Sequence, residues 1–74
     1  MKISKRSLPG YIRHQEVKLE NNLRTAESCE ELLEELDPSD IYLYSAIAHE
    51  LETANSNVKH LGKQINHLRG ELAE

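Results

Sequence analysis

The second half of the chain carries its apolar residues at alternating intervals of three and four positions. They fall at Tyr44, Ile47, Leu51, Ala54, Val58, Leu61, Ile65, Leu68 and Leu72. This heptad stripe is typical of a helix that packs along another helix, whereas a β-strand changes face at every residue. The pattern predicts a helix over residues 38–72, about 50 Å long at about 1.5 Å per residue.

The first half has a rougher stripe of the same kind. Its members on one helical face are Ile12, Leu19, Leu23, Ala26, Cys29, Leu33 and Leu36. Gln15 and Asn22 interrupt this face. Pro9 and Gly10 favour a helix start, because proline is tolerated in the first turn of a helix and poorly further in. We expect a first helix over residues 9–36.

The sequence DPSD joins the two stripes at residues 37–40 and predicts a chain reversal. Asp37 can cap the second helix, and Pro38 suits its first position, where the missing N–H costs nothing. In an antiparallel hairpin the residue numbers of facing partners add up to a constant. The two stripes satisfy this at a sum of 80, with the pairs Leu33–Ile47, Cys29–Leu51, Ala26–Ala54, Leu19–Leu61, Ile12–Leu68 and Leu8–Leu72.

We therefore predict an all-α fold, an antiparallel two-helix hairpin of the coiled-coil type. Residues 8–74 form this helical domain, and residues 1–7 a disordered basic N-terminal arm. A chain of 74 residues is marginally stable alone. We expect further helices to complete a four-helix bundle, supplied by dimerisation or by a partner protein. Gly62, which costs about 1 kcal/mol relative to alanine inside a helix, can admit a neighbouring backbone closely.

Apolar residues outside the two stripes gather near the predicted turn. They are Leu32, Ile41, Tyr42, Leu43, Ala46 and Ala48. In one interpretation they only widen the internal core beside the turn. In the other, which we favour, they form a binding surface for a second copy or for another protein, because tyrosine is enriched at protein interfaces.

The net charge of −4 is unevenly distributed. Residues 1–18 carry five basic residues against Glu16, and residues 27–40 carry seven acidic residues and no basic one. A hairpin gathers the acidic block at the bend and the basic residues at the open end. The acidic block either serves solubility and capping or binds a basic partner, and its like-charged pairs four residues apart disfavour the helix that contains them.

Chemical motifs are absent from the sequence. It has no phosphate-binding glycine loop, HExxH, CxxC or calcium loop, so we expect no enzyme activity, metal, cofactor or small-molecule substrate. Cys29 is interpreted as a buried structural thiol whose pKa is raised by Glu27, Glu30 and Glu31. A single thiol suits a reducing compartment, and no segment is long and apolar enough to span a bilayer, so we expect a cytoplasmic protein of a bacterium or phage.

These observations predict a small protein-interaction module that acts as a regulator, inhibitor, adaptor or small chaperone. The alternative is a nucleic-acid-binding bundle that uses the basic open end. Its candidate residues are Lys2, Lys5, Arg6, Arg13, Lys18, Lys59, Lys63 and Arg69. We favour the first, because the pI is about 5.5 and only Tyr11 could stack on a base.

Overall fold

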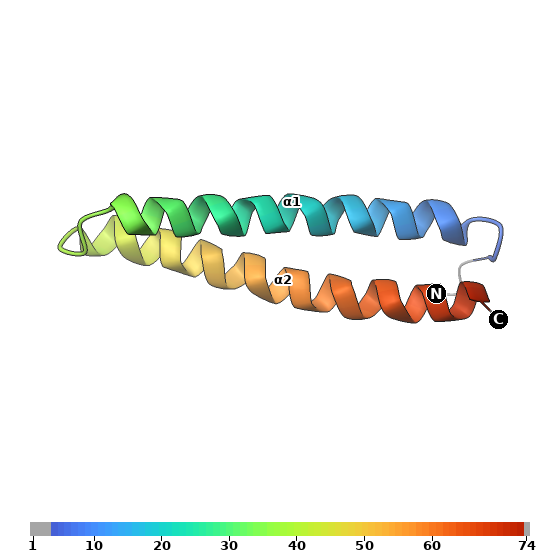
Figure 1. Cartoon of the computed structure of the whole chain (residues 1–74). Coiled ribbons are helices and arrows are strands. Elements are labelled where there is room, and N and C mark those ends of the chain that lie inside the picture. Colours follow the sequence, from blue (N-terminus) through green and yellow to red (C-terminus); the bar gives the residue numbers. More distant parts are fainter. Residues whose placement is uncertain (1–3, 74) are drawn as a thin grey trace.

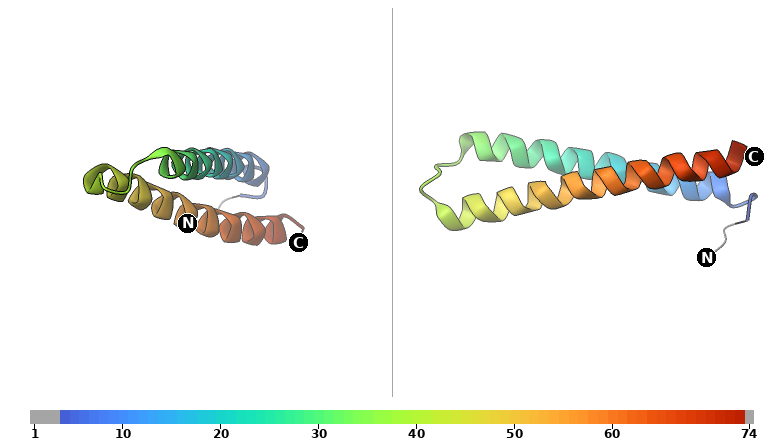
Figure 2. Two further views of the ribbon diagram at one scale, coloured as in Figure 1. Left: turned by 60° about the vertical axis from the view of Figure 1, so that its left-hand side comes forward. Right: turned by 90° about the horizontal axis from the view of Figure 1, so that it is seen from below.

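The computed structural model describes residues 4–73, which form two long helices joined by one turn (Figure 1). Helix α1 spans Leu8–Glu35 and helix α2 spans Ile41–Ala73. They run antiparallel and cross at a shallow angle (Figure 2), in a body whose Cα extents are 53 × 17 × 14 Å. The predicted all-α hairpin is therefore confirmed for the single chain.

The segment before α1 differs in part from the disordered arm predicted for residues 1–7. Residues 1–3 lie outside the described residues. Residues 4–7 form a turn, in which the backbone N–H groups of Ser7 and Leu8 donate to the carbonyl of Ser4 at 3.0 and 3.1 Å. This turn leads directly into α1, with Pro9 in the first helical turn, where it removes no intrahelical hydrogen bond.

One continuous seam of side chains holds the two helices together. At the open end it contains a buried cluster of Leu8, Ile12, Ile65 and Leu68, against which Tyr11 and Leu19 pack. Further along, it contains buried Ala26, Cys29 and Ala54. The other predicted core residues on the seam are half-buried: Leu33, Leu36, Tyr44, Ile47, Leu51, Val58 and Leu61.

The contacts between the helices agree with the predicted register. The side-chain amide of Asn57 donates to that of Asn22 at 3.2 Å, and the two residue numbers add up to 79. Ile12 and Leu68, a pair predicted to face each other, belong to the same buried cluster. The register therefore follows from the match between the two heptad patterns.

Leu23 was predicted to lie in the core, and the structure corrects this. Its side chain is 45% exposed. The heptad step from Leu19 to Ala26 passes through position 22, so it is Asn22 that faces α2. Gln15 occupies another seam position and is only 4% exposed. The seam thus contains two amide side chains, and Leu23 is displaced to its side.

The turn uses Asp37 differently from the prediction. The backbone N–H of Asp40 donates to the Asp37 carbonyl at 3.0 Å, which closes a four-residue turn. The Asp37 carboxylate accepts the backbone N–H of Ser39 at 3.0 Å, and this hydrogen bond lowers the pKa of Asp37. Asp before Pro38 is the favoured start of such a turn, because the fixed φ of proline suits its second position.

Helix α2 consequently begins at Ile41 rather than at Pro38. Asp40 caps it instead of Asp37: its carboxylate accepts the backbone N–H of Leu43 at 3.3 Å, and its carbonyl accepts that of Tyr44 at 2.9 Å. A cap carboxylate satisfies one of the free N–H groups of the first helical turn.

The buried cluster at the open end generates the first prediction. The side chain of Ile65 is 3% exposed. Ile65→Ala should lower the free energy of unfolding by about 2–4 kcal/mol, because the cavity left in the seam cannot collapse fully. Urea denaturation followed by circular dichroism measures this. Val17→Ala, at a 39% exposed position on α1, is the control and should change stability by less than about 0.5 kcal/mol. Equal losses of stability in the two variants would contradict the burial of Ile65 in the seam.

The cap generates the second prediction. Asp40→Ala should lower the unfolding free energy by about 1 kcal/mol, whereas Asp40→Asn, which keeps a side-chain oxygen for the Leu43 N–H, should lose much less. The same denaturation measurement applies. If the two variants lose the same amount of unfolding free energy, the side-chain oxygen of residue 40 does not act as the cap.

Candidate interaction surface

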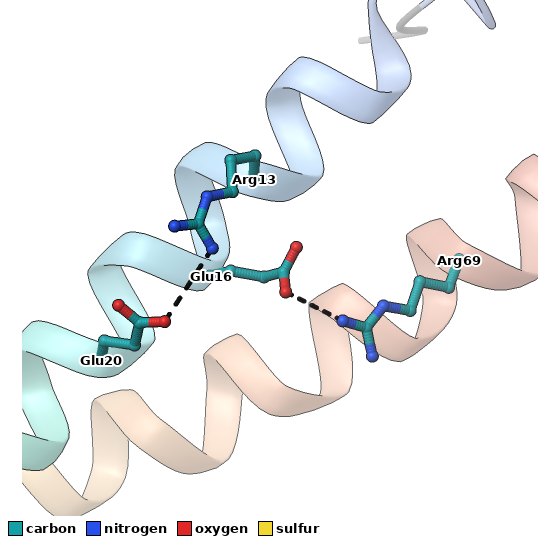
Figure 3. Close-up of polar contacts among 4 residues, drawn as sticks. All are labelled: Arg13, Glu16, Glu20 and Arg69. Carbon is teal, nitrogen blue, oxygen red and sulfur yellow. Dashed lines mark hydrogen bonds and ion pairs between the residues drawn. The ribbon is translucent and has the colours of Figure 1, made fainter.

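A two-helix hairpin has one flank on each side of its seam, and polar contacts between the helices identify both. On one flank, the side-chain amide of Gln64 donates to the Tyr11 hydroxyl at 3.4 Å. On the other, the Arg69 guanidinium donates to the Glu16 carboxylate at 3.0 Å (Figure 3). Residues seven positions apart share one side of a helix, so these pairs assign the remaining flank residues. We call the two sides the Tyr11 flank and the Glu16 flank.

Leu32 and Leu43 lie on the Tyr11 flank beside the turn, one on each helix. Leu32 follows Tyr11 by three heptads, and Leu43 precedes Gln64 by three heptads. Each leucine is 45% exposed. The hairpin therefore places two exposed leucines, eleven residues apart in the chain, on the same flank.

The other residues of the predicted binding surface lie elsewhere around the turn. Ile41 and Ala48 precede Arg69 by four and three heptads and lie on the Glu16 flank. Tyr42 is 90% exposed and points away from the seam, and Ala46 is exposed as well. The predicted surface is thus wrapped around the turn end of the hairpin and is not one flat face.

Four large apolar side chains remain exposed at this end. They form what we call the turn-end patch: Leu32, Ile41, Tyr42 and Leu43, which are 45%, 68%, 90% and 45% exposed. The seam beneath them is only half-buried, while the buried cluster lies at the opposite end of the hairpin. The turn end is therefore the less completely covered part of the apolar seam.

Acidic groups surround the turn-end patch. Residues 25–58 contain no Lys or Arg, and the seven acidic residues of the predicted block are all exposed. Within residues 4–73, the ion pairs join Arg13 to Glu20, His67 to Glu71 and Arg69 to Glu16, so none includes a residue of this block. The acidic charge beside the patch is not neutralised within the described chain.

The basic open end offers less to a nucleic acid than the sequence implied. Arg13 lies 3.9 Å from Glu20, and Arg69 lies 3.0 Å from Glu16 (Figure 3). Tyr11, the aromatic side chain considered for stacking, is half-buried and packs against the core cluster. Of the other candidate bases, Lys2 lies outside the described residues.

Cys29 is buried in the seam, 3% exposed. Burial is the main cause that raises the pKa of its thiol, and the carboxylate of Glu50 on α2 adds to the effect. The sequence had suggested Glu27, Glu30 and Glu31 instead. That expectation is corrected because seam residues turn toward the opposite helix, which brings a carboxylate of that helix close to the thiol.

Within residues 4–73, no group of three or more His, Cys, Asp or Glu side chains is arranged to hold a metal ion. No helix in that range is long and apolar enough to cross a membrane. Comparison of the chain with protein-family models, with curated proteins and with solved structures gives no match. A functional proposal must therefore come from the surface of the hairpin.

The environment of Cys29 generates the third prediction. Alkylation by iodoacetamide at neutral pH should be about tenfold or more slower in the folded chain than in the urea-unfolded chain, because the thiol is buried and its thiolate is disfavoured. Mass spectrometry of timed samples gives both rates. Because the pKa is raised on folding, stability should also fall as the pH rises above the ordinary thiol value of 9.0. Equal alkylation rates in the two states would refute the buried thiol.

Proposed function

We propose that this protein is a non-enzymatic interaction module that binds another protein through the turn-end patch, as a regulator, inhibitor, adaptor or small chaperone. The observation that carries the proposal is the exposure of four large apolar side chains at one end of the hairpin. Exposed large apolar side chains that gather in one region of a soluble protein mark protein contact sites.

The composition of the surface also favours a protein partner. A protein–protein interface has an apolar centre with aromatic side chains and a polar rim. Leu32 and Leu43 supply an apolar side chain from each helix, Tyr42 an aromatic side chain, and the exposed carboxylates a charged rim. A helix of the partner laid on this end would cover the half-buried seam and complete a bundle.

A nucleic-acid partner is less well supported. Nine carboxylates and no Lys or Arg lie within residues 25–58, so phosphates are repelled from the turn half. At the open half, Arg13 and Arg69 already have carboxylate partners. Any residual binding to nucleic acid at that end should weaken steeply with salt, whereas binding through an apolar patch should not.

The fourth prediction tests the turn-end patch. The double variant Leu32→Ser, Leu43→Ser should capture less than about a tenth of the partner that wild type captures. Each leucine contributes about 1.5–3 kcal/mol when its side chain is fully buried. Affinity capture from the source cells with quantitative mass spectrometry compares the double variant with wild type. Val17→Ser, with a 39% exposed apolar side chain away from the turn, is the matched control and should retain the partner.

Circular dichroism of both variants verifies that the helices are intact. The proposal fails if wild type and the double variant capture the same proteins in equal amounts, or if the loss is as large in the Val17 control. If the change of a single polar residue abolished a biological activity of the protein while the helices stayed intact, that result would point to catalysis instead.

A further inference from the structure

Folding separates the charges of this chain into two halves. All nine Lys and Arg residues lie outside residues 25–58, and nine of the thirteen Asp and Glu residues lie within that range. Because the chain reverses at residues 37–40, residues 25–58 make up the turn half of the hairpin, and residues 4–24 and 59–73 make up the open half (Figure 1). The turn half carries a net charge of −9 and the open half +5, which together give −4.

The Glu16 flank has an exposed leucine near its middle. Leu23 follows Glu16 by one heptad, and Gly62 precedes Arg69 by one heptad, so both lie on this flank, with Gly62 nearer the open end. Leu23 is 45% exposed, and a Cβ added at Gly62 would meet no atom within 4 Å. One heptad further toward the turn, α2 carries the exposed polar side chain of Asn55. A large side chain from outside can therefore approach α2 at Gly62, on the same flank as Leu23.

Charged residues of opposite sign lie on the two sides of Leu23. Toward the turn, the same side of α1 carries the exposed acids Glu27, Glu30 and Glu34. Toward the open end, this flank carries Arg13, Lys59 and Arg69, together with Glu16 and Glu20, which the two arginines already contact (Figure 3). The order along the flank is therefore acidic, apolar, then mixed with a basic excess.

We propose that the Glu16 flank is the interface of an antiparallel dimer of this chain, in which the turn half of each copy lies on the open half of the other. A two-fold interface uses the same surface on both copies, so that surface must be complementary to itself after a half rotation. A flank with an apolar centre, acids on one side and a basic excess on the other meets this condition.

The two-fold axis passes close to Leu23. Full overlap of two hairpins places the axis at their middle, and Leu23 lies near the middle of α1. Each Leu23 then packs against Leu23 of the other copy, and Gly62 leaves open space on the same flank. Glu30 of each copy then lies level with Glu16 of the other, whose carboxylate Arg69 already contacts.

Charge decides between this arrangement and a dimer formed through the turn-end patches. Turn against turn would place two halves of charge −9 side by side, which is repulsive. The antiparallel arrangement places −9 beside +5 twice. The Cα extents of 53 × 17 Å bound a face of about 900 Å², so a standard interface of roughly 800 Å² per partner requires contact along nearly the whole flank.

Single thiols test the dimer directly. With Cys29→Ala as background, Leu23→Cys, Val17→Cys and Leu43→Cys each carry one introduced thiol. A disulfide needs Cα atoms about 4.4–6.8 Å apart, which the axis beside Leu23 permits only for the first variant. Mild oxidation followed by non-reducing electrophoresis should give a covalent dimer of Leu23→Cys in at least about tenfold excess over the other two. A dimer that forms chiefly through Leu43→Cys, or equally in all three, would overturn the proposal.

Sedimentation of the wild-type chain supplies the second measurement. The mass should be about twice 8.5 kDa at low salt, and the dissociation constant should rise several-fold as salt screens the opposite charges. A dissociation constant that falls as salt rises would indicate repulsion between two turn halves. A mass of 8.5 kDa at low salt would indicate a monomer. Either result would refute the antiparallel dimer.

This dimer and the leucines of the proposed function lie on different flanks, although Ile41 of the turn-end patch is on the Glu16 flank. Leu23→Glu should abolish the dimer and retain helicity, since the side chain is 45% exposed, and it should leave capture through Leu32 and Leu43 on the Tyr11 flank unchanged. Failure of the dimer therefore leaves the turn-end proposal standing, and the reverse also holds.

Discussion

The single apolar seam between α1 and α2 is the constraint from which the rest of this structure follows. With two helices, each helix has one neighbour, so burial is confined to one line of side chains from Leu8 and Leu68 at the open end to Leu33 and Ile47 near the turn. Everything beside that line stays in contact with solvent. The exposed leucines are thus a consequence of having too few helices to cover the apolar residues that the chain carries.

The seam also fixes the register that gives the flanks their composition. Its two amide side chains, Gln15 and Asn22, weaken the apolar contact, but the hydrogen bond between Asn22 and Asn57 is available only when the helices are correctly aligned. Polar residues at single seam positions are known to specify register at some cost in stability. Here that alignment places Leu32 and Leu43 on one flank and Leu23 and Gly62 on the other.

Chain reversal converts an uneven distribution of charge along the sequence into a separation of charge in space. The bases of both chain ends meet at the open half, where two arginines form ion pairs, and the acids on both sides of the turn meet at the other half. Exposed ion pairs of this kind add little stability. The charges that remain unneutralised act on association more than on stability. They favour one orientation of an approaching molecule over others.

The sequence by itself determined the two helices, the reversal between them and the register, because a heptad pattern is a local property and antiparallel pairing relates the two patterns by one sum. It did not determine which residue caps α2: Asp37 and Asp40 are both competent, and only the closed turn leaves Asp40 at the helix start. It placed Leu23 in the core, since one helix alone does not show which of two adjacent positions faces its neighbour. Only the pairing of the helices decided that Leu32 shares a flank with Leu43 while Ile41 lies on the other flank, because a flank is defined by two helices together.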